Sequence, residues 1–91
     1  MKATYLVTLY KSTNTRGQLE TESKSVICGT STLDGARAKM VELAKNKLRE
    51  LENGTLYKFD IEESSSSIKI VCLSAGIKAK SYEFVICTQW A

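Results

Sequence analysis

The side chains that most often do chemistry are few in this chain, and the lack of histidine limits what they can do. The 91 residues include three cysteines, Cys28, Cys72 and Cys87, and no His. A Cys or Ser nucleophile usually needs a nearby base, most often His, to remove its proton. A helix N-terminus can activate a thiol without a base, and Cys28 shortly precedes a predicted helix. Because each cysteine stands in an apolar run, we expect all three to be small core residues and the protein not to be an enzyme.

Metal and cofactor sites have equally weak support. Zinc sites cluster Cys and His at short spacings, whereas these cysteines are far apart along the chain. The acidic group Asp60, Glu62 and Glu63 lacks a calcium-loop pattern, and a solvated strand end explains it. Residues 29–32, Gly-Thr-Ser-Thr, precede the helix but lack the spaced glycines and lysine of a phosphate-binding loop. We therefore expect a helix cap here, no metal and no cofactor.

Composition and charge describe one ordinary globular domain spanning residues 1–91. The chain is 43% hydrophobic and 25% charged, with a net charge of +3. No signal-peptide pattern occurs at the start, and no apolar run approaches the ~20 residues that cross a bilayer. The odd number of cysteines, without a disulfide-type spacing, is typical of reduced thiols. These features predict a cytoplasmic protein without a membrane partner.

The first third of the chain predicts a β-hairpin. Residues 3–12 are rich in aromatic, β-branched and Thr side chains, and residues 18–28 alternate between two faces. Turn-forming residues ending at Gly17 separate the two strands. A three-residue loop would place Tyr10 opposite Glu22, and the pattern does not exclude a slip of one residue.

A long amphipathic helix is predicted over residues 33–52. Ser31 or Thr32 can cap it, Asp34 lies in its first turn, and Gly54 follows it as a stop. Its charged side carries Lys and Glu at spacings of three, which is typical of a solvated face. The apolar positions recur every three or four residues: Leu33, Ala36, Met40, Leu43, Ala44, Leu48 and Leu51.

Three further strands are predicted at residues 55–62, 68–74 and 78–88. The serines at 64–67 predict a flexible loop that packs against nothing. Cross-strand pairing favours the register that puts Lys69 opposite Glu83, which leaves Ile77 in the turn.

The predicted fold is therefore a single α+β domain of order β-β-α-β-β-β. Its five-stranded sheet is antiparallel or mixed, and one helix packs on one face. With the first strand parallel to the last, this element order is similar to the β-grasp of ubiquitin-like domains, without any shared residue motif. The competing arrangement is an antiparallel meander.

A binding role follows from the apolar residues that the strands carry on both faces. One helix covers only one face of a sheet, so sheet curvature, self-association or a partner must cover the rest. We therefore predict a small interaction module, adaptor- or inhibitor-like, that binds a protein or a second copy of itself. Its contacts would be the uncovered sheet face or an edge strand. The predicted anchors are Leu6, Tyr10 and Trp90.

Weak nucleic-acid binding is the alternative function. The last hairpin carries basic residues that the pattern puts on one strand face, with an aromatic ring nearby. The residues of this alternative site are Lys69, Lys78, Lys80 and Tyr82.

Overall fold

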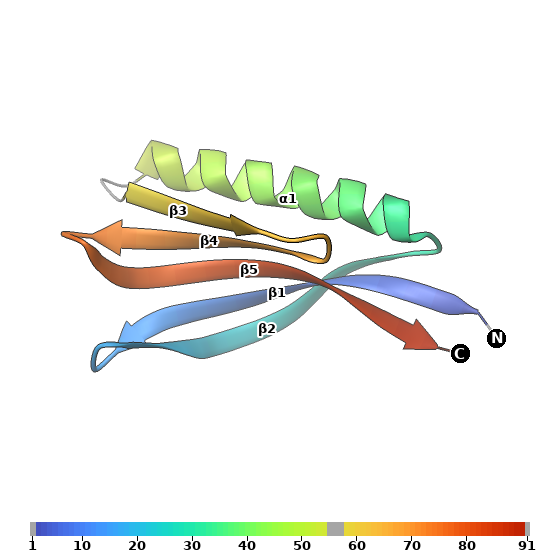
Figure 1. Ribbon diagram of the computed structural model, residues 1–91, viewed down its shortest axis with the longest axis horizontal. Helices are drawn as coiled ribbons and strands as arrows, with labels where there is room; N and C mark the ends of the chain where they lie inside the picture. The colour runs from blue at the N-terminus through green and yellow to red at the C-terminus, as the bar shows by residue number, and fades with distance from the viewer. Residues whose placement is uncertain (1, 55–57, 91) are drawn as a thin grey trace.

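The computed structural model describes residues 2–54 and 58–90 and has one antiparallel sheet with a helix on one face (Figure 1). This arrangement confirms the predicted α+β class and element order. The part of the predicted third strand at residues 55–57 lies outside the described residues. The elements are β1 (Ala3–Thr15), β2 (Gln18–Thr30), α1 (Leu33–Gly54), β3 (Lys58–Glu63), β4 (Ser67–Ser74) and β5 (Ile77–Trp90).

The five strands lie in the order β2-β1-β5-β4-β3, and every neighbouring pair is antiparallel. The central β1 therefore pairs with β5 in the opposite direction, and the parallel, β-grasp-like arrangement is wrong. A plain meander is wrong too, because α1 connects the two edge strands. The helix returns the chain to the end of the sheet where β2 began (Figure 1). Two further reversals then make β5 run against β1.

The core lies between α1 and strands β1, β4 and β5. The helix buries Ala36, Met40 and Ala44, which are spaced by four residues and so lie on one face. The small alanines let the helix approach the sheet closely. The larger buried side chains come mainly from the strands and include Val7, Ile68, Tyr82 and Phe84.

Thr32 caps the helix, as one of the two predicted candidates. Its Oγ1 accepts a hydrogen bond of 3.0 Å from the N–H of Gly35, and its carbonyl accepts one of 3.1 Å from Ala36. A Cβ on Gly35 would lie 2.8 Å from that hydroxyl, so a side chain there would disturb the cap. These bonds satisfy N–H groups that lack partners at a helix start, which supports the cap interpretation of residues 29–32.

The first hairpin differs from its predicted register. Its turn has two residues, Arg16 and Gly17, whose φ angles are 55° and 87°. Positive φ at both positions is the type I′ geometry, which matches the twist of the strands better than the three-residue loop predicted. Register shifts then occur at two places in the ladder, and Tyr10 pairs with Lys24 instead of Glu22.

The β4–β5 register is the one predicted, with Lys69 opposite Glu83. Its two-residue turn, Ala75 and Gly76, has φ angles of 51° and 79°. Ile77 is not in the turn, because it begins β5 and pairs with Ser74. A register shift farther along the ladder absorbs the extra residue, so the β-branched side chain avoids positive φ.

The sheet curls, and this covers part of the face that has no helix. Thr8 and Ser81 lie on that face, and each is only 2% exposed. Cα atoms of β2 and β5 come within 8 Å although β1 separates these strands. In a flat sheet, second neighbours lie about 10 Å apart. Curvature of the sheet therefore helps to bury the face of the strands that the helix does not cover.

The serine loop between β3 and β4 is hydrogen-bonded, so the prediction that it packs against nothing is wrong. Ser64 Oγ lies 2.9 Å from Ser67 Oγ and accepts a 3.1 Å bond from the N–H of Ser67. The guanidinium Nε of Arg37 donates to the carbonyl of Ser65 at 3.1 Å. Short hydroxyl side chains bond readily to nearby backbone, and here they form the turn that leads out of β3.

Candidate protein-binding surface

The three predicted anchors do not form one surface. Val7 and Leu9 pack in the core, so Leu6 and Tyr10 point to the face of β1 away from the helix. Trp90 is an even number of residues from the core residue Phe84 along β5, so its side chain lies on the helix side of the sheet. The sheet therefore separates Trp90 from the other two.

Leu6 and Tyr10 are both partly buried by their neighbours. The Leu6 side chain lies over Gly29, where an added Cβ would meet its Cδ2 at 3.2 Å. The Lys24 ammonium lies 5.5 Å from the centroid of the Tyr10 ring. Tyr10 also borders a polar hollow whose other lining residues are Ser12, Leu19, Thr21, Lys69, Ser81 and Glu83. These surroundings make the centre of this face more polar than an apolar docking face would be.

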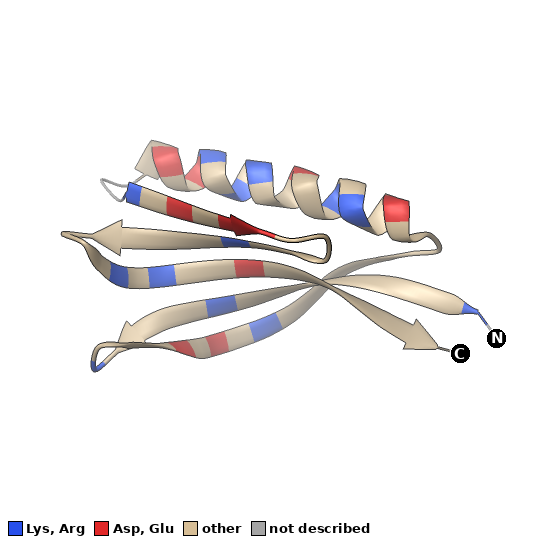
Figure 2. Ribbon diagram, viewed as in Figure 1, with Lys and Arg blue, Asp and Glu red and all other residues tan. Residues whose placement is uncertain are grey.

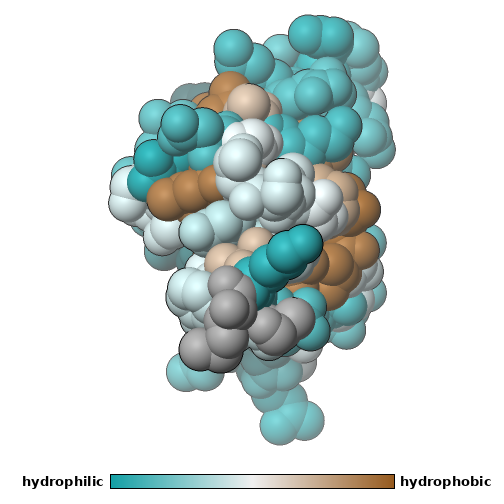
Figure 3. Space-filling model, turned by 90° about the vertical axis from the view of Figure 1, so that its right-hand side faces the viewer, coloured by the Kyte–Doolittle hydropathy of each residue, from teal (hydrophilic) through white to brown (hydrophobic). Residues whose placement is uncertain are grey.

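Trp90 is 65% exposed at the last position of β5. The 22 residues of α1 span about 33 Å, whereas the 14 residues of β5 span about 46 Å. The ends of β1 and β5 therefore project past the helix (Figure 1). Figure 3 looks at this end of the molecule and shows hydrophobic patches separated by hydrophilic surface.

The alternative nucleic-acid site does not assemble either. Lys69 lies between Glu62 and Glu83 in the ladder, so acidic neighbours offset its charge. Lys78 and Lys80 pair with consecutive residues of β4, whose side chains alternate between faces. The register shift therefore works against the single basic face that the sequence suggests.

Tyr82 is a core residue, so it is not free to stack on a base. Only 7% of it is exposed, and it belongs to the cluster beneath α1. The Lys47 ammonium lies 5.0 Å from its ring centroid, and burial raises the pKa of the phenol. The ring packs inward because position 82 faces the helix together with Phe84.

The cysteines take up packing positions. Cys72 is fully buried in the core, and burial raises the pKa of its thiol. Cys28 and Cys87 are partly buried, and Cys28 packs against the core. Among residues 2–54 and 58–90, no three Cys, Asp or Glu residues come together as a metal site would require. The part of the chain that the structure describes contains no helix suited to crossing a membrane.

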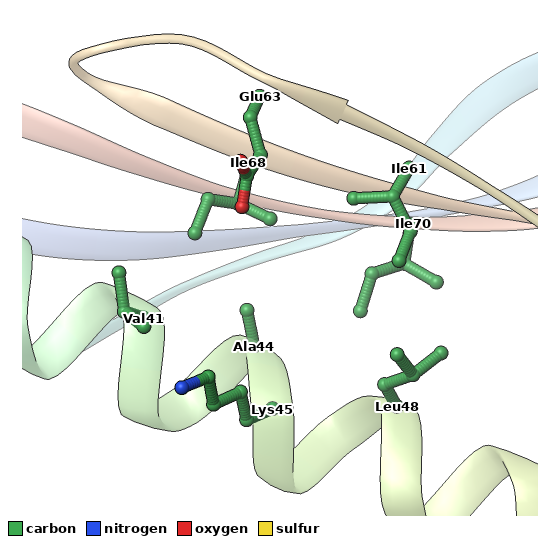
Figure 4. A pocket seen from close by; sticks show the side chains of 8 residues that line it. All are labelled: Val41, Ala44, Lys45, Leu48, Ile61, Glu63, Ile68 and Ile70. Atoms are coloured by element: carbon green, nitrogen blue, oxygen red, sulfur yellow. The ribbon is translucent and has the colours of Figure 1, made fainter.

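An apolar groove lies between α1 and the strands β3 and β4 (Figure 4). Val41, Ala44 and Leu48 point from the helix towards the strands, with Val41 beneath Ile68 and Leu48 beneath Ile61 and Ile70. Lys45, Glu63 and Ile68 complete its lining. The groove has a volume of about 70 Å³, well below the roughly 300–1,000 Å³ of small-molecule sites. Its size suits a single side chain better than a metabolite.

The groove exists because α1 packs over β1, β4 and β5 and covers the helix side of β3 only in part, where Phe59 packs against the core. Ile61 is consequently 49% exposed, and Val41 on the helix is 39% exposed. Ile61 was not predicted from the sequence as a site residue. The alternation in its strand indicates an inward-facing side chain, but the sequence does not say that this strand lies at the edge of the sheet, where the helix covers it only in part.

Among the described residues, each edge strand is paired on one side only, and of the two only β3 is regular. The β2 strand is 13 residues long, and its pairing with β1 contains two register shifts. Bulges are a common way to keep an edge from pairing with another chain. Described residues of β3 pair with β4 without any shift. The β3 edge is therefore short but well formed for strand addition.

Acidic residues lie along the β3 edge, as Figure 2 shows. Asp60 and Glu62 alternate with Ile61, so they lie on the sheet face opposite the groove. Glu63 is at the rim of the groove. Within the described part of the chain, none of these three carboxylates forms an ion pair.

Comparison with protein-family models, curated proteins and solved structures finds no match to this chain.

Proposed function

We propose that this protein is a non-catalytic protein-binding module that receives an extended segment of its partner along the β3 edge. The observation that carries the proposal is the exposed Ile61 on a regular edge strand, directly beside an apolar groove. Strand addition supplies main-chain hydrogen bonds, and a pocket for alternate side chains supplies selectivity.

The other candidate surfaces support binding less well. The face away from the helix is curled and polar at its centre, and the basic hairpin residues have acidic neighbours or split between faces. The proposal keeps the edge-strand form of the predicted interaction module. It replaces the anchors Leu6, Tyr10 and Trp90 with the groove residues Ile61 and Val41.

Substitution of Ile61 by Lys tests the proposal. It places a charge at the groove, and strand addition that buries the site would then have to desolvate it. The matched control is Ile27→Lys, because Ile27 is a similarly exposed isoleucine, at 42%, on the other edge strand. We expect Ile61→Lys to lose the proteins that the wild type captures from lysate and Ile27→Lys to retain them, as measured by quantitative mass spectrometry.

Circular dichroism of both variants checks that each is folded. The proposal is wrong if the folded Ile61→Lys variant captures the same proteins as the wild type. It is also wrong if the two isoleucine variants lose the same proteins to the same extent.

A further inference from the structure

We infer, on the basis of the proposed function, that the β3 edge selects an extended segment in which branched apolar side chains alternate with Lys or Arg. The inference concerns the chemistry of the partner segment and follows from the different character of the two sides of β3. One side opens to the apolar groove, and the other carries carboxylates.

The alternation follows from strand geometry. A strand that pairs with β3 continues the sheet, and its side chains point in turn to the two faces. Those on the helix side lie beside Ile61 and reach the groove. Those on the opposite side lie beside Asp60 and Glu62.

The groove side favours a branched aliphatic residue. Five of its lining side chains are themselves branched aliphatics, namely Val41, Leu48, Ile61, Ile68 and Ile70. Its volume of about 70 Å³ is small. The small size and apolar lining of the groove therefore suit Val, Ile or Leu.

The opposite side favours cations. Asp60 and Glu62 are exposed, and neither forms an ion pair within residues 2–54 and 58–90. The nearest basic residues in the ladder are Lys58, on β3 itself, and Lys69, opposite Glu62. On this face β3 carries two acids, Asp60 and Glu62, and one lysine, Lys58, in a chain of net charge +3, because Glu63 lies on the groove side. Opposite charges across a strand pair stabilise it, and like charges destabilise it.

The β2 edge offers no comparable pattern. Its acidic residues Glu20 and Glu22 are followed by Lys24, and its register shifts disturb the alternation. It therefore serves as an internal control for charge effects that are not specific to β3.

Three synthetic peptides of equal length test the inference on the full chain. Their sequences are Lys-Val-Lys-Ile-Lys-Val-Lys, Thr-Val-Thr-Ile-Thr-Val-Thr and Glu-Val-Glu-Ile-Glu-Val-Glu. Binding is followed by the amide shifts of β3 in nitrogen–proton NMR spectra and by titration at low and at moderate salt. We expect the Lys peptide to shift β3 amides and to bind about tenfold more tightly than the Thr peptide. Added salt should weaken its binding.

Charge reversal at the two edges provides the matched variants. We expect Asp60→Lys combined with Glu62→Lys to weaken binding of the Lys peptide by about tenfold or more. We expect Glu20→Lys combined with Glu22→Lys to leave binding within about twofold of the wild type. Equal loss in both double variants would overturn the inference, because it would indicate attraction by net charge alone.

The peptides also separate the two proposals. If the Thr or Glu peptide shifts the β3 amides as strongly as the Lys peptide, the inferred basic chemistry is wrong and strand addition at β3 stands. If none of the three shifts them, both the inference and the proposed function are overturned.

Discussion

Two buried ionisable side chains, Cys72 and Tyr82, make the stability of the fold depend on pH. Both lie in the cluster beneath α1, and in both cases burial is the main reason why the pKa is raised. The interior disfavours thiolate and phenolate, whereas the unfolded chain leaves both groups in water. Lys80 lowers both values but does not outweigh burial.

The fold should therefore weaken at alkaline pH. Below the unfolded-state pKa values, each group is neutral in both states and its contribution to stability is complete. As the pH rises from about 8, the unfolded chain ionises first, so the free energy of unfolding falls until the folded groups ionise as well. Urea titrations from pH 7 to 11 should show this fall. Tyr82→Phe should reduce the part of this fall that occurs above about pH 10. If the variant shows the same dependence of the free energy of unfolding on pH as the wild type, a raised Tyr82 pKa is contradicted.

Single residues also show where sequence reasoning stops. Tyr82 shares its parity along the strand with Phe84 and Ile86, and this signal indicates a core position rather than a contact with nucleic acid. Ile61 carries the same inward signal and is nevertheless half-exposed. The alternation of side chains along a strand indicates the sheet face to which a residue points. The position of the strand in the sheet decides whether anything covers that face.

The elements themselves could be predicted well, because their signals are local. The apolar spacing predicts α1 to within two residues at its C-terminal end, and Thr32 is one of two predicted caps. The hairpin turns were less predictable. Arg16 and Ala75 adopt positive φ, which non-glycine residues rarely do, so both turns are shorter than the sequence suggests.

The β4–β5 turn can be improved by one substitution. Ala75 has a φ of 51° and precedes Gly76 at 79°, and Asn is the preferred first residue of such a type I′ turn. We expect Ala75→Asn to raise the free energy of unfolding by roughly 0.5–1 kcal/mol. Ala75→Val should lower it, because a β-branched residue resists positive φ. Urea unfolding measures both, and equal effects of the two would rule out backbone conformation as the cause.

At the scale of the whole molecule, strand order is what the sequence leaves open. The β1–β5 pairing joins residues near opposite ends of the chain, and no local pattern records it. The groove depends on that order, because it makes β3 an edge strand that the helix covers only in part. An edge strand could therefore be expected from the sequence, but the sequence did not show that β3 is this strand.

Hydrogen exchange can test this order and the availability of the site together. β1, β5 and β4 are paired on both sides, whereas β2 and β3 are each paired on one side only. Amides that point outward from β3 have no strand partner among the described residues, so they should exchange at least about tenfold faster than central amides of β5. Measurement at two protein concentrations separates a free edge from one that a second copy covers. Slow exchange of these amides at both concentrations would mean that the β3 edge is already occupied, and an occupied edge could not receive a partner strand.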